Sequence, residues 1–219
     1  MIRGAIFDMD GVLLDSNGHW EKAAEKYLEG LGIAPRPGMA QAIFEMTLPE
    51  AADYLIRECG VRQSPEEILQ GCNAVMKAFY ESEIEKKEGI FELLDALQMK
   101  GIPMMVATVT DRPLVEAGLK RHGLLDFFEG IVTAAEAGEG KSSPRIYLEA
   151  ANRIRCKPEE TLVFEDALHA LRTAKKAGFV TVGVYDAYSE EKQEEMKASA
   201  QLYLRDYMDL AALDKQLSR

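Results

Sequence analysis

The sequence contains few of the residues that build zinc sites or disulfide frameworks. It has three cysteines, Cys59, Cys72 and Cys156, and no Cys-x-x-Cys pair occurs among them. Cysteines scattered in this way argue against both a zinc site and a set of disulfides. We therefore expect three reduced thiols, which are typical of proteins in a reducing cytosol.

Long apolar runs and an excess of positive charge are also absent. No run is long enough to span a bilayer, and no basic segment followed by an apolar one opens the chain. We therefore expect a cytoplasmic protein without a signal peptide. Lys and Arg together number 26 against 37 Asp and Glu, for a net charge of −11. Because so acidic a chain repels polyanions, we expect neither nucleic acid nor a membrane surface as a partner.

The most informative stretch that is present lies near the N-terminus, where an apolar run leads into two carboxylates. Residues 5–7 are typical of a strand, and Asp8 and Asp10 follow at a spacing of two residues. In an extended backbone this spacing places both carboxylates on the same side. Gly11 then allows a sharp turn. Two like charges this close favour a bound cation or a shared proton, so the stretch predicts a site.

The 219 residues divide into two parts with different periodicity. Residues 17–87 show only helical spacing of apolar side chains, whereas residues 88–219 alternate between helical and strand patterns. This alternation predicts a parallel sheet with helices on both faces, and the first strand belongs to it by type. We therefore predict an α/β fold with a Rossmann-like core, formed by residues 1–16 and 88–219, and an inserted helical domain, residues 17–87.

The individual elements follow from periodicity and from capping residues. In the inserted domain, helices are expected over 19–31, 39–46, 48–60 and 65–85, with Thr47 and Ser64 as N-caps of the last two. In the core, helices are expected over 90–100, 112–122, 144–154, 167–177 and 189–198, and a final helix from about Met208. Strands are expected over 2–7, 104–108, 130–133, 161–164 and 181–184. Residues 202–204 form only a short apolar patch.

Ligands of an open parallel sheet lie beyond the carboxyl ends of its strands, so the residues expected there are candidates for a site. These residues are Asp8, Asp10, Thr108, Lys141, Glu165 and Asp166. Carboxylate oxygens suit Mg²⁺, whereas a hydroxyl group, a lysine and backbone N–H groups suit phosphate oxygens. One carboxylate is then available to attack phosphorus and form an aspartyl-phosphate.

This set of motifs resembles that of the haloacid dehalogenase superfamily. The matching residues are, in chain order, Asp8-Met9-Asp10-Gly11, Thr108, Lys141 and Glu165-Asp166. The resemblance covers nearly the whole chain, including a helical cap after the first motif. Within the superfamily, the chain is similar to the branch of β-phosphoglucomutases and small-metabolite phosphatases.

The resemblance implies catalytic roles for three residues. Asp8 would be the nucleophile and a Mg²⁺ ligand. Asp10 would be the general acid and base, and its backbone carbonyl would also bind the metal. Lys141 would neutralise the phosphoryl group and steady Asp8.

The resemblance also implies residues that bind substrate and metal. Thr108 would hydrogen-bond the phosphoryl group, with Val109 beside it in the substrate-binding segment and Lys141 as a further contact. Asp166 would ligate Mg²⁺. Glu165 would either ligate the ion directly or contact the residues that do. The chain departs from the family pattern at three positions, where Ser142 replaces a proline, Arg145 an aspartate and Ala167 a serine.

The resemblance therefore implies a phosphoric monoester hydrolase that uses Mg²⁺ on a small phosphomonoester such as a sugar phosphate. We expect a monomer or weak dimer. A hexose-phosphate phosphomutase is one alternative, although Trp20 stands where the mutase cap has a histidine. An inactive protein that binds a phosphometabolite is another. Residues 135–142 also resemble a P-loop, but Glu136 and Glu139 would place negative charge in its phosphate cradle.

Overall fold

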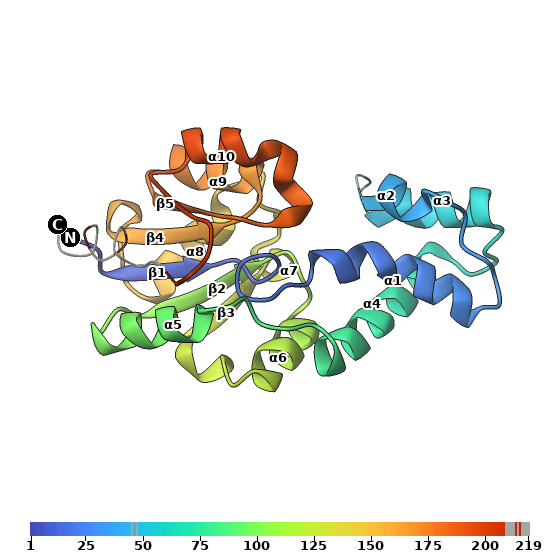
Figure 1. The fold of residues 1–219 in the computed structure, drawn as a ribbon, viewed down its shortest axis with the longest axis horizontal. Helices are drawn as coiled ribbons and strands as arrows, with labels where there is room; N and C mark the ends of the chain where they lie inside the picture. The colour runs from blue at the N-terminus through green and yellow to red at the C-terminus, as the bar shows by residue number, and fades with distance from the viewer. Residues whose placement is uncertain (45, 47, 209–212, 214, 216–219) are drawn as a thin grey trace. The chain divides into compact units, whose positions relative to one another are not determined.

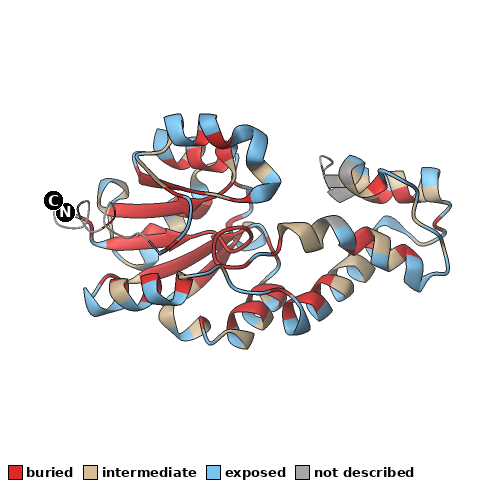
Figure 2. Ribbon diagram, viewed as in Figure 1, coloured by how far each residue is buried: buried red, intermediate tan, exposed pale blue. Residues whose placement is uncertain are grey.

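The computed structural model describes residues 1–44, 46, 48–208, 213 and 215. The chain divides into two compact units, one formed by Met1–Asp15 with Glu85–Arg219 and the other by Ser16–Ile84. Each unit has its own buried core (Figure 2). Among the described residues, no helix combines the length and apolar character needed to cross a membrane.

The larger unit is built on a parallel sheet, as predicted. Within the described residues, six strands lie in the order β3-β2-β1-β4-β5-β6, and all their pairings are parallel. Their bounds are β1 Gly4–Phe7, β2 Met104–Thr108, β3 Gly130–Thr133, β4 Thr161–Glu165, β5 Val180–Val184 and β6 Leu202–Leu204 (Figure 1). The first strand therefore lies inside the sheet, between β2 and β4.

Helices connect these strands and cover the sheet. Their bounds are α5 Ile90–Met99, α6 Arg112–Arg121, α7 Ala134–Ala137, α8 Arg145–Arg153, α9 Leu168–Lys176 and α10 Gln193–Ser199. Short 3₁₀ turns η1, η2 and η3 cover Leu125–Phe127, Pro158–Glu160 and Ala187–Lys192. On one face, Ile146 and Tyr147 of α8 pack against Ile6 and Val163. Phe7 and Phe164 follow Ile6 and Val163 along their strands, and their rings stack with centroids 4.2 Å apart.

The structure corrects two local predictions near the C-terminus. The helix expected over 189–198 begins as a 3₁₀ turn, and the α-helix starts only at Gln193. The apolar patch at 202–204 is β6, which pairs with β5 through contacts such as Val184 with Leu204. A segment of three residues is too short to show a periodic pattern, so this strand is identified only by its pairing with β5. The helix expected from about Met208 falls largely outside the described residues.

The regular elements described in the smaller unit are all helices. It contains α1 Asn17–Gly30, α2 Met39–Phe44, α3 Leu48–Cys59 and α4 Pro65–Ser82, packed around buried side chains that include Leu28, Leu55 and Ile68. The predicted capping box at the start of α4 is present, because Glu67 and Ser64 bond reciprocally. The N-cap expected at Thr47 lies outside the described residues.

Candidate active site

Strand β1 carries Asp8 and Asp10 to the carboxyl end of the sheet. The Asp8 N–H donates to the carbonyl of Phe164 at 3.1 Å, which extends the pairing of β1 with β4 past Phe7. The chain then turns at Gly11, whose φ of 74° lies in the left-handed region that favours glycine. Asp8 is 7% exposed and Asp10 9%. The turn therefore holds two nearly buried carboxylates beside the end of β4.

Lys141 joins the acidic ends of β1 and β4. Its Nζ lies 2.6 Å from Asp8 Oδ1 and 2.6 Å from Glu165 Oε1, and the whole residue is buried. Burial disfavours the charged ammonium group, but the attraction of Asp8 and Glu165 outweighs it and raises the pKa of Lys141. Lys141 is therefore a fixed positive charge against Asp8.

Glu165, the last residue of β4, is held on one of its oxygens by a hydrogen bond and by an ion pair. The Tyr147 hydroxyl donates to Glu165 Oε1 at 2.6 Å, and Lys141 Nζ contacts the same atom. The other oxygen, Oε2, is buried and has no hydrogen-bond partner among the described residues. Burial raises the pKa of Glu165 to about 7, although Lys141 opposes the shift.

Three carboxylates at this edge of the sheet fit a divalent cation. Ligand atoms of Asp8, Glu165 and Asp166 lie within 4.8 Å of one another, and all three residues are buried. Burial, and then the charges of Asp8 and Glu165, raise the pKa of Asp166. Three carboxylates facing one lysine need further positive charge to ionise together. All the donors are oxygens, which suits Mg²⁺, and the unpartnered Glu165 Oε2 fits a ligand role.

The end of β2 and the residues after it form the other side of the site. Thr108 is fully buried, whereas the Val109 side chain is 58% exposed. Thr110 is buried as well, and its backbone N–H donates to Thr108 Oγ1 at 3.1 Å. The Thr110 hydroxyl donates to Asp10 Oδ2 at 2.6 Å. The structure therefore connects Thr108 and Asp10 through Thr110.

Sequence reasoning missed two residues of this site, Tyr147 and Thr110. Thr110 follows Thr108 at the spacing of two that places Asp8 and Asp10 on one side, so the same pattern was available to find it. Tyr147 shows no such signal, because a tyrosine on the apolar face of a helix is usually a core residue. Its contact with Glu165 depends on how α8 packs on the sheet.

The segment that resembles a P-loop does not form a phosphate cradle. Residues 134–137 are the short helix α7, which Thr133 and Glu136 begin with a capping box. Glu136 is also paired with Arg112, whose Nε lies 2.6 Å from Glu136 Oε1. The backbone N–H groups that a phosphate would need are therefore partly used in α7.

Two departures from the family pattern lie at helix starts, Arg145 at the beginning of α8 and Ala167 directly after Asp166. Arg145 is exposed and its Nη1 lies 3.6 Å from Glu139 Oε1. Ala167 is the N-cap residue of α9, where no side-chain cap bond is made. A serine there would accept a helix N–H, so the missing hydroxyl weakens a helix start.

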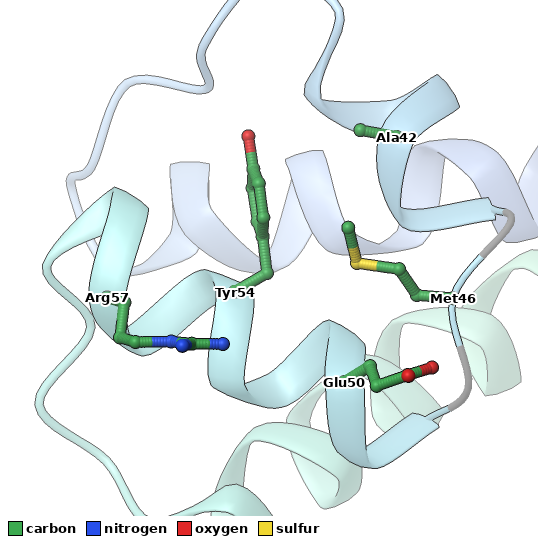
Figure 3. A pocket seen from close by; sticks show the side chains of 5 residues that line it. All are labelled: Ala42, Met46, Glu50, Tyr54 and Arg57. Carbon is green, nitrogen blue, oxygen red and sulfur yellow. The ribbon is translucent and has the colours of Figure 1, made fainter.

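The helical unit contains a cavity of about 440 Å³ between residues of α2 and α3 and the segment that joins them (Figure 3). Tyr54, Arg57 and Glu50 line it from α3, and Ala42 and Met46 line it from the other side. Its lining therefore combines an aromatic ring, a thioether and one side chain of each charge.

Comparison with known proteins gives matches over most of the chain. The family described as haloacid dehalogenase-like hydrolase matches residues 5–184. YhcW of Bacillus subtilis is 32% identical over 183 residues, which cover 83% of each chain. The phosphorylated carbohydrates phosphatase of Thermotoga maritima is 27% identical over 192 residues, 87% of this chain and 89% of that protein.

A solved structure extends the similarity to three dimensions. CbbY from Rhodobacter sphaeroides, in complex with phosphate, has a TM-score of 0.83 and 26% identity, and the match covers 98% of this chain and 100% of that one. The chain belongs to the family of haloacid dehalogenase-like hydrolases. The predicted resemblance, the fold class and the prediction of a hydrolase of this type are thereby confirmed.

Proposed function

We propose that the protein is a Mg²⁺-dependent phosphatase that hydrolyses a small phosphomonoester through a phosphorylated Asp8. The observation that carries the proposal is the position of Asp8. One of its oxygens lies 2.6 Å from the Lys141 ammonium group, and the residue belongs to a buried group of three carboxylates suited to a cation. A carboxylate held against a lysine, with a cation offsetting the neighbouring acids, is a nucleophile that a phosphate dianion can approach.

In the first half of the reaction, a carboxylate oxygen of Asp8 attacks phosphorus and a new O–P bond forms. The bond from phosphorus to the ester oxygen breaks, and its electron pair stays on that oxygen. Asp10, as a carboxylic acid, gives its proton to this leaving oxygen, so an alcohol departs. Lys141 and the Thr108 hydroxyl stabilise the charge on the phosphoryl oxygens.

In the second half, water attacks the phosphorus atom bound to Asp8. Asp10, now a carboxylate, takes a proton from this water. The bond between Asp8 and phosphorus breaks and its electron pair returns to the carboxylate. Orthophosphate leaves, and both aspartates are restored to their starting states.

Asp8, Asp166 and Glu165 would hold the Mg²⁺ ion, together with the backbone carbonyl of Asp10. When bound, the ion supplies positive charge that offsets the repulsion between Asp8 and the phosphate. Glu165 is oriented for this role by Tyr147 and Lys141 on its Oε1 atom. Orientation of ligands by groups behind them is a general feature of metal sites.

We propose sugar phosphates as the substrate class. The relative from Thermotoga maritima is named for phosphorylated carbohydrates, and CbbY binds phosphate in its crystal. We also propose that the helical unit is the cap domain that selects the substrate, because the grouped carboxylates and lysine recognise only phosphate and metal. Arg57, a charged residue lining the cavity of this unit, is a candidate for that selection.

The proposed function is tested by measuring phosphate release with Mg²⁺ from a panel of phosphorylated metabolites, with Asp8→Asn as the blank. We expect release from sugar phosphates by the wild type and none by the variant. Isomerised phosphosugar without release, dependent on a bisphosphate activator, would instead indicate a phosphomutase. Ligand-induced stabilisation without turnover would indicate a binding protein.

A further inference from the structure

Thr110 makes two hydrogen bonds that no role assigned above requires. Its hydroxyl donates to Asp10 Oδ2 at 2.6 Å, and its backbone N–H donates to Thr108 Oγ1 at 3.1 Å. Thr110 is 4% exposed and lies just beyond the end of β2. One buried residue thus contacts both the proposed general acid and the proposed phosphoryl-binding hydroxyl.

The bond to Asp10 restricts the one rotation that a proton donor must control. A carboxyl group turns about its Cβ–Cγ bond, and this terminal torsion is broad and weakly restrained on its own. A short hydrogen bond to Oδ2 fixes the plane of the group and therefore the direction of Oδ1. Asp10 lies in a turn after β1, so Thr110 attaches this side chain to a different strand end.

The bond to Thr108 determines whether the Thr108 hydroxyl donates or accepts. A threonine hydroxyl can both donate and accept. Because Thr108 Oγ1 accepts the N–H of Thr110, its own O–H is directed elsewhere and can donate to a phosphoryl oxygen. This contact is made by the backbone of Thr110, so a side-chain substitution preserves it while removing the bond to Asp10.

A buried threonine elsewhere in the same sheet shows the ordinary use of such a hydroxyl. Thr161 is fully buried at the start of β4, the opposite end of the sheet from the site. Its hydroxyl donates to the backbone carbonyl of Lys157 at 2.8 Å. The Thr110 hydroxyl instead reaches a carboxyl group in the turn after another strand. Hydrogen bonds to ionised groups are stronger than those between neutral groups.

We propose that Thr110 is a positioning residue that orients Asp10 for proton transfer to the leaving group. The inference rests on the proposed function, in which Asp10 gives its proton to the ester oxygen. Poor leaving groups need that proton, whereas p-nitrophenolate leaves readily without it. Loss of the Thr110 hydroxyl must therefore slow alkyl phosphates more than p-nitrophenyl phosphate.

The test compares kcat/KM of Thr110→Val for a responsive sugar phosphate and for p-nitrophenyl phosphate. We expect kcat/KM to fall about 10-fold for the sugar phosphate and less than about 3-fold for p-nitrophenyl phosphate. These losses are smaller than the loss expected on removing the general acid itself. Thr110→Ser, which keeps the hydroxyl, should restore the wild-type ratio. Thr161→Val is the matched control and should leave the ratio unchanged. Thr110→Ala removes the same hydroxyl should the valine variant not fold.

A double variant separates positioning from a merely structural role. If Thr110 acts through Asp10, Thr110→Val should cost nothing further when Asp10 is already Asn. Equal losses on both substrates, or full additivity with Asp10→Asn, would overturn the inference while the phosphatase assignment stands. A folded wild type that releases phosphate from neither substrate would overturn the proposed function itself, and the inference with it.

Discussion

The two carboxylate pairs at the ends of β1 and β4 look alike in sequence but are built differently. On β1, Asp8 and Asp10 are spaced by two residues and take different partners, since Asp8 contacts Lys141 and Asp10 accepts from the Thr110 hydroxyl. On β4, Glu165 and Asp166 are adjacent, yet both join the same group of potential metal ligands. In a continuous strand, adjacent side chains point to opposite faces. Strand β4 ends at Glu165, so this alternation does not extend to Asp166.

This comparison indicates that the partner, more than the spacing, distinguishes the proposed roles of these acids. A permanent positive charge beside Asp8 suits a group that must stay anionic and attack. A neutral hydroxyl beside Asp10 suits a group that must carry and release a proton. The β4 pair is buried with one lysine and one tyrosine, which suits a group that binds a cation. Each following prediction alters one member of the comparison.

The largest effect is expected at Asp8. Asp8→Asn removes the proposed nucleophile and should lower phosphate release by at least about 10³-fold on every substrate. The Asn side chain has nearly the same shape, so thermal unfolding should still be cooperative. Measurable turnover at more than a few per cent of wild type would place the nucleophile elsewhere.

Asp10→Asn should give the next largest effect, and an uneven one. Loss of the general acid should cost about 10²-fold on an alkyl phosphate and much less on p-nitrophenyl phosphate. Steady-state kinetics on the two substrates gives the comparison directly. Equal losses on the two substrates would contradict the general-acid role of Asp10, and with it the difference in role between Asp8 and Asp10.

Asp166→Asn changes the β4 pair and should act on the metal. We expect the Mg²⁺ concentration for half-maximal activity to rise by about 10²-fold or less, with p-nitrophenyl phosphate and sugar phosphate affected alike. Mg²⁺-dependent thermal stabilisation of the substrate-free protein should weaken in parallel. Asp111→Asn, which alters an exposed carboxylate near the site, is the control. An unchanged Mg²⁺ titration would contradict the ligand role.

The stability of the metal-free protein should depend on pH because the pKa of folded Glu165 is raised to about 7. Between about pH 4.5 and 7 the folded state binds more protons than the unfolded state, so the free energy of unfolding falls as pH rises. Glu165 alone should contribute about 3 kcal/mol of this loss. Urea unfolding at several pH values, with and without Mg²⁺, tests this. The same slope in saturating Mg²⁺ would contradict the link to the metal site.

Tyr147→Phe should give the smallest effect. It removes one donor from the buried Glu165 Oε1 and should lower the free energy of unfolding by about 1–3 kcal/mol. Tyr207→Phe is the matched control, because that buried hydroxyl donates to the neutral carbonyl of Val12 at 2.9 Å. A smaller loss for Tyr147→Phe than for the control would show that the Glu165 contact is unimportant to the fold.

The sequence allowed prediction of those features that depend on position along a strand. The parallel sheet, and the meeting of Asp8, Lys141 and Glu165 at its carboxyl edge, follow from alternation and from the rule that ligands lie beyond strand ends. Each of these residues lies in or next to a strand end or a connecting loop that the periodicity identifies.

The features that escaped prediction depend on contacts between distant segments. Residues 202–204 become a strand only because β5 offers an edge, and the helix start at Gln193 depends on a preceding 3₁₀ turn. Tyr147 reaches Glu165 only through the packing of α8 on the sheet. No local propensity encodes such approaches, because they are set by the tertiary fold.

The central claim is that Asp8 carries the phosphoryl group during turnover. The most direct test is a rapid acid quench of the enzyme, mixed with Mg²⁺ and a substrate labelled in its phosphate, followed by mapping of the labelled peptide. The account predicts label on the peptide that contains Asp8, sensitive to base and hydroxylamine, and absent from Asp8→Asn. Turnover of the substrate with no transient label on the protein, or with label on another residue, would contradict it.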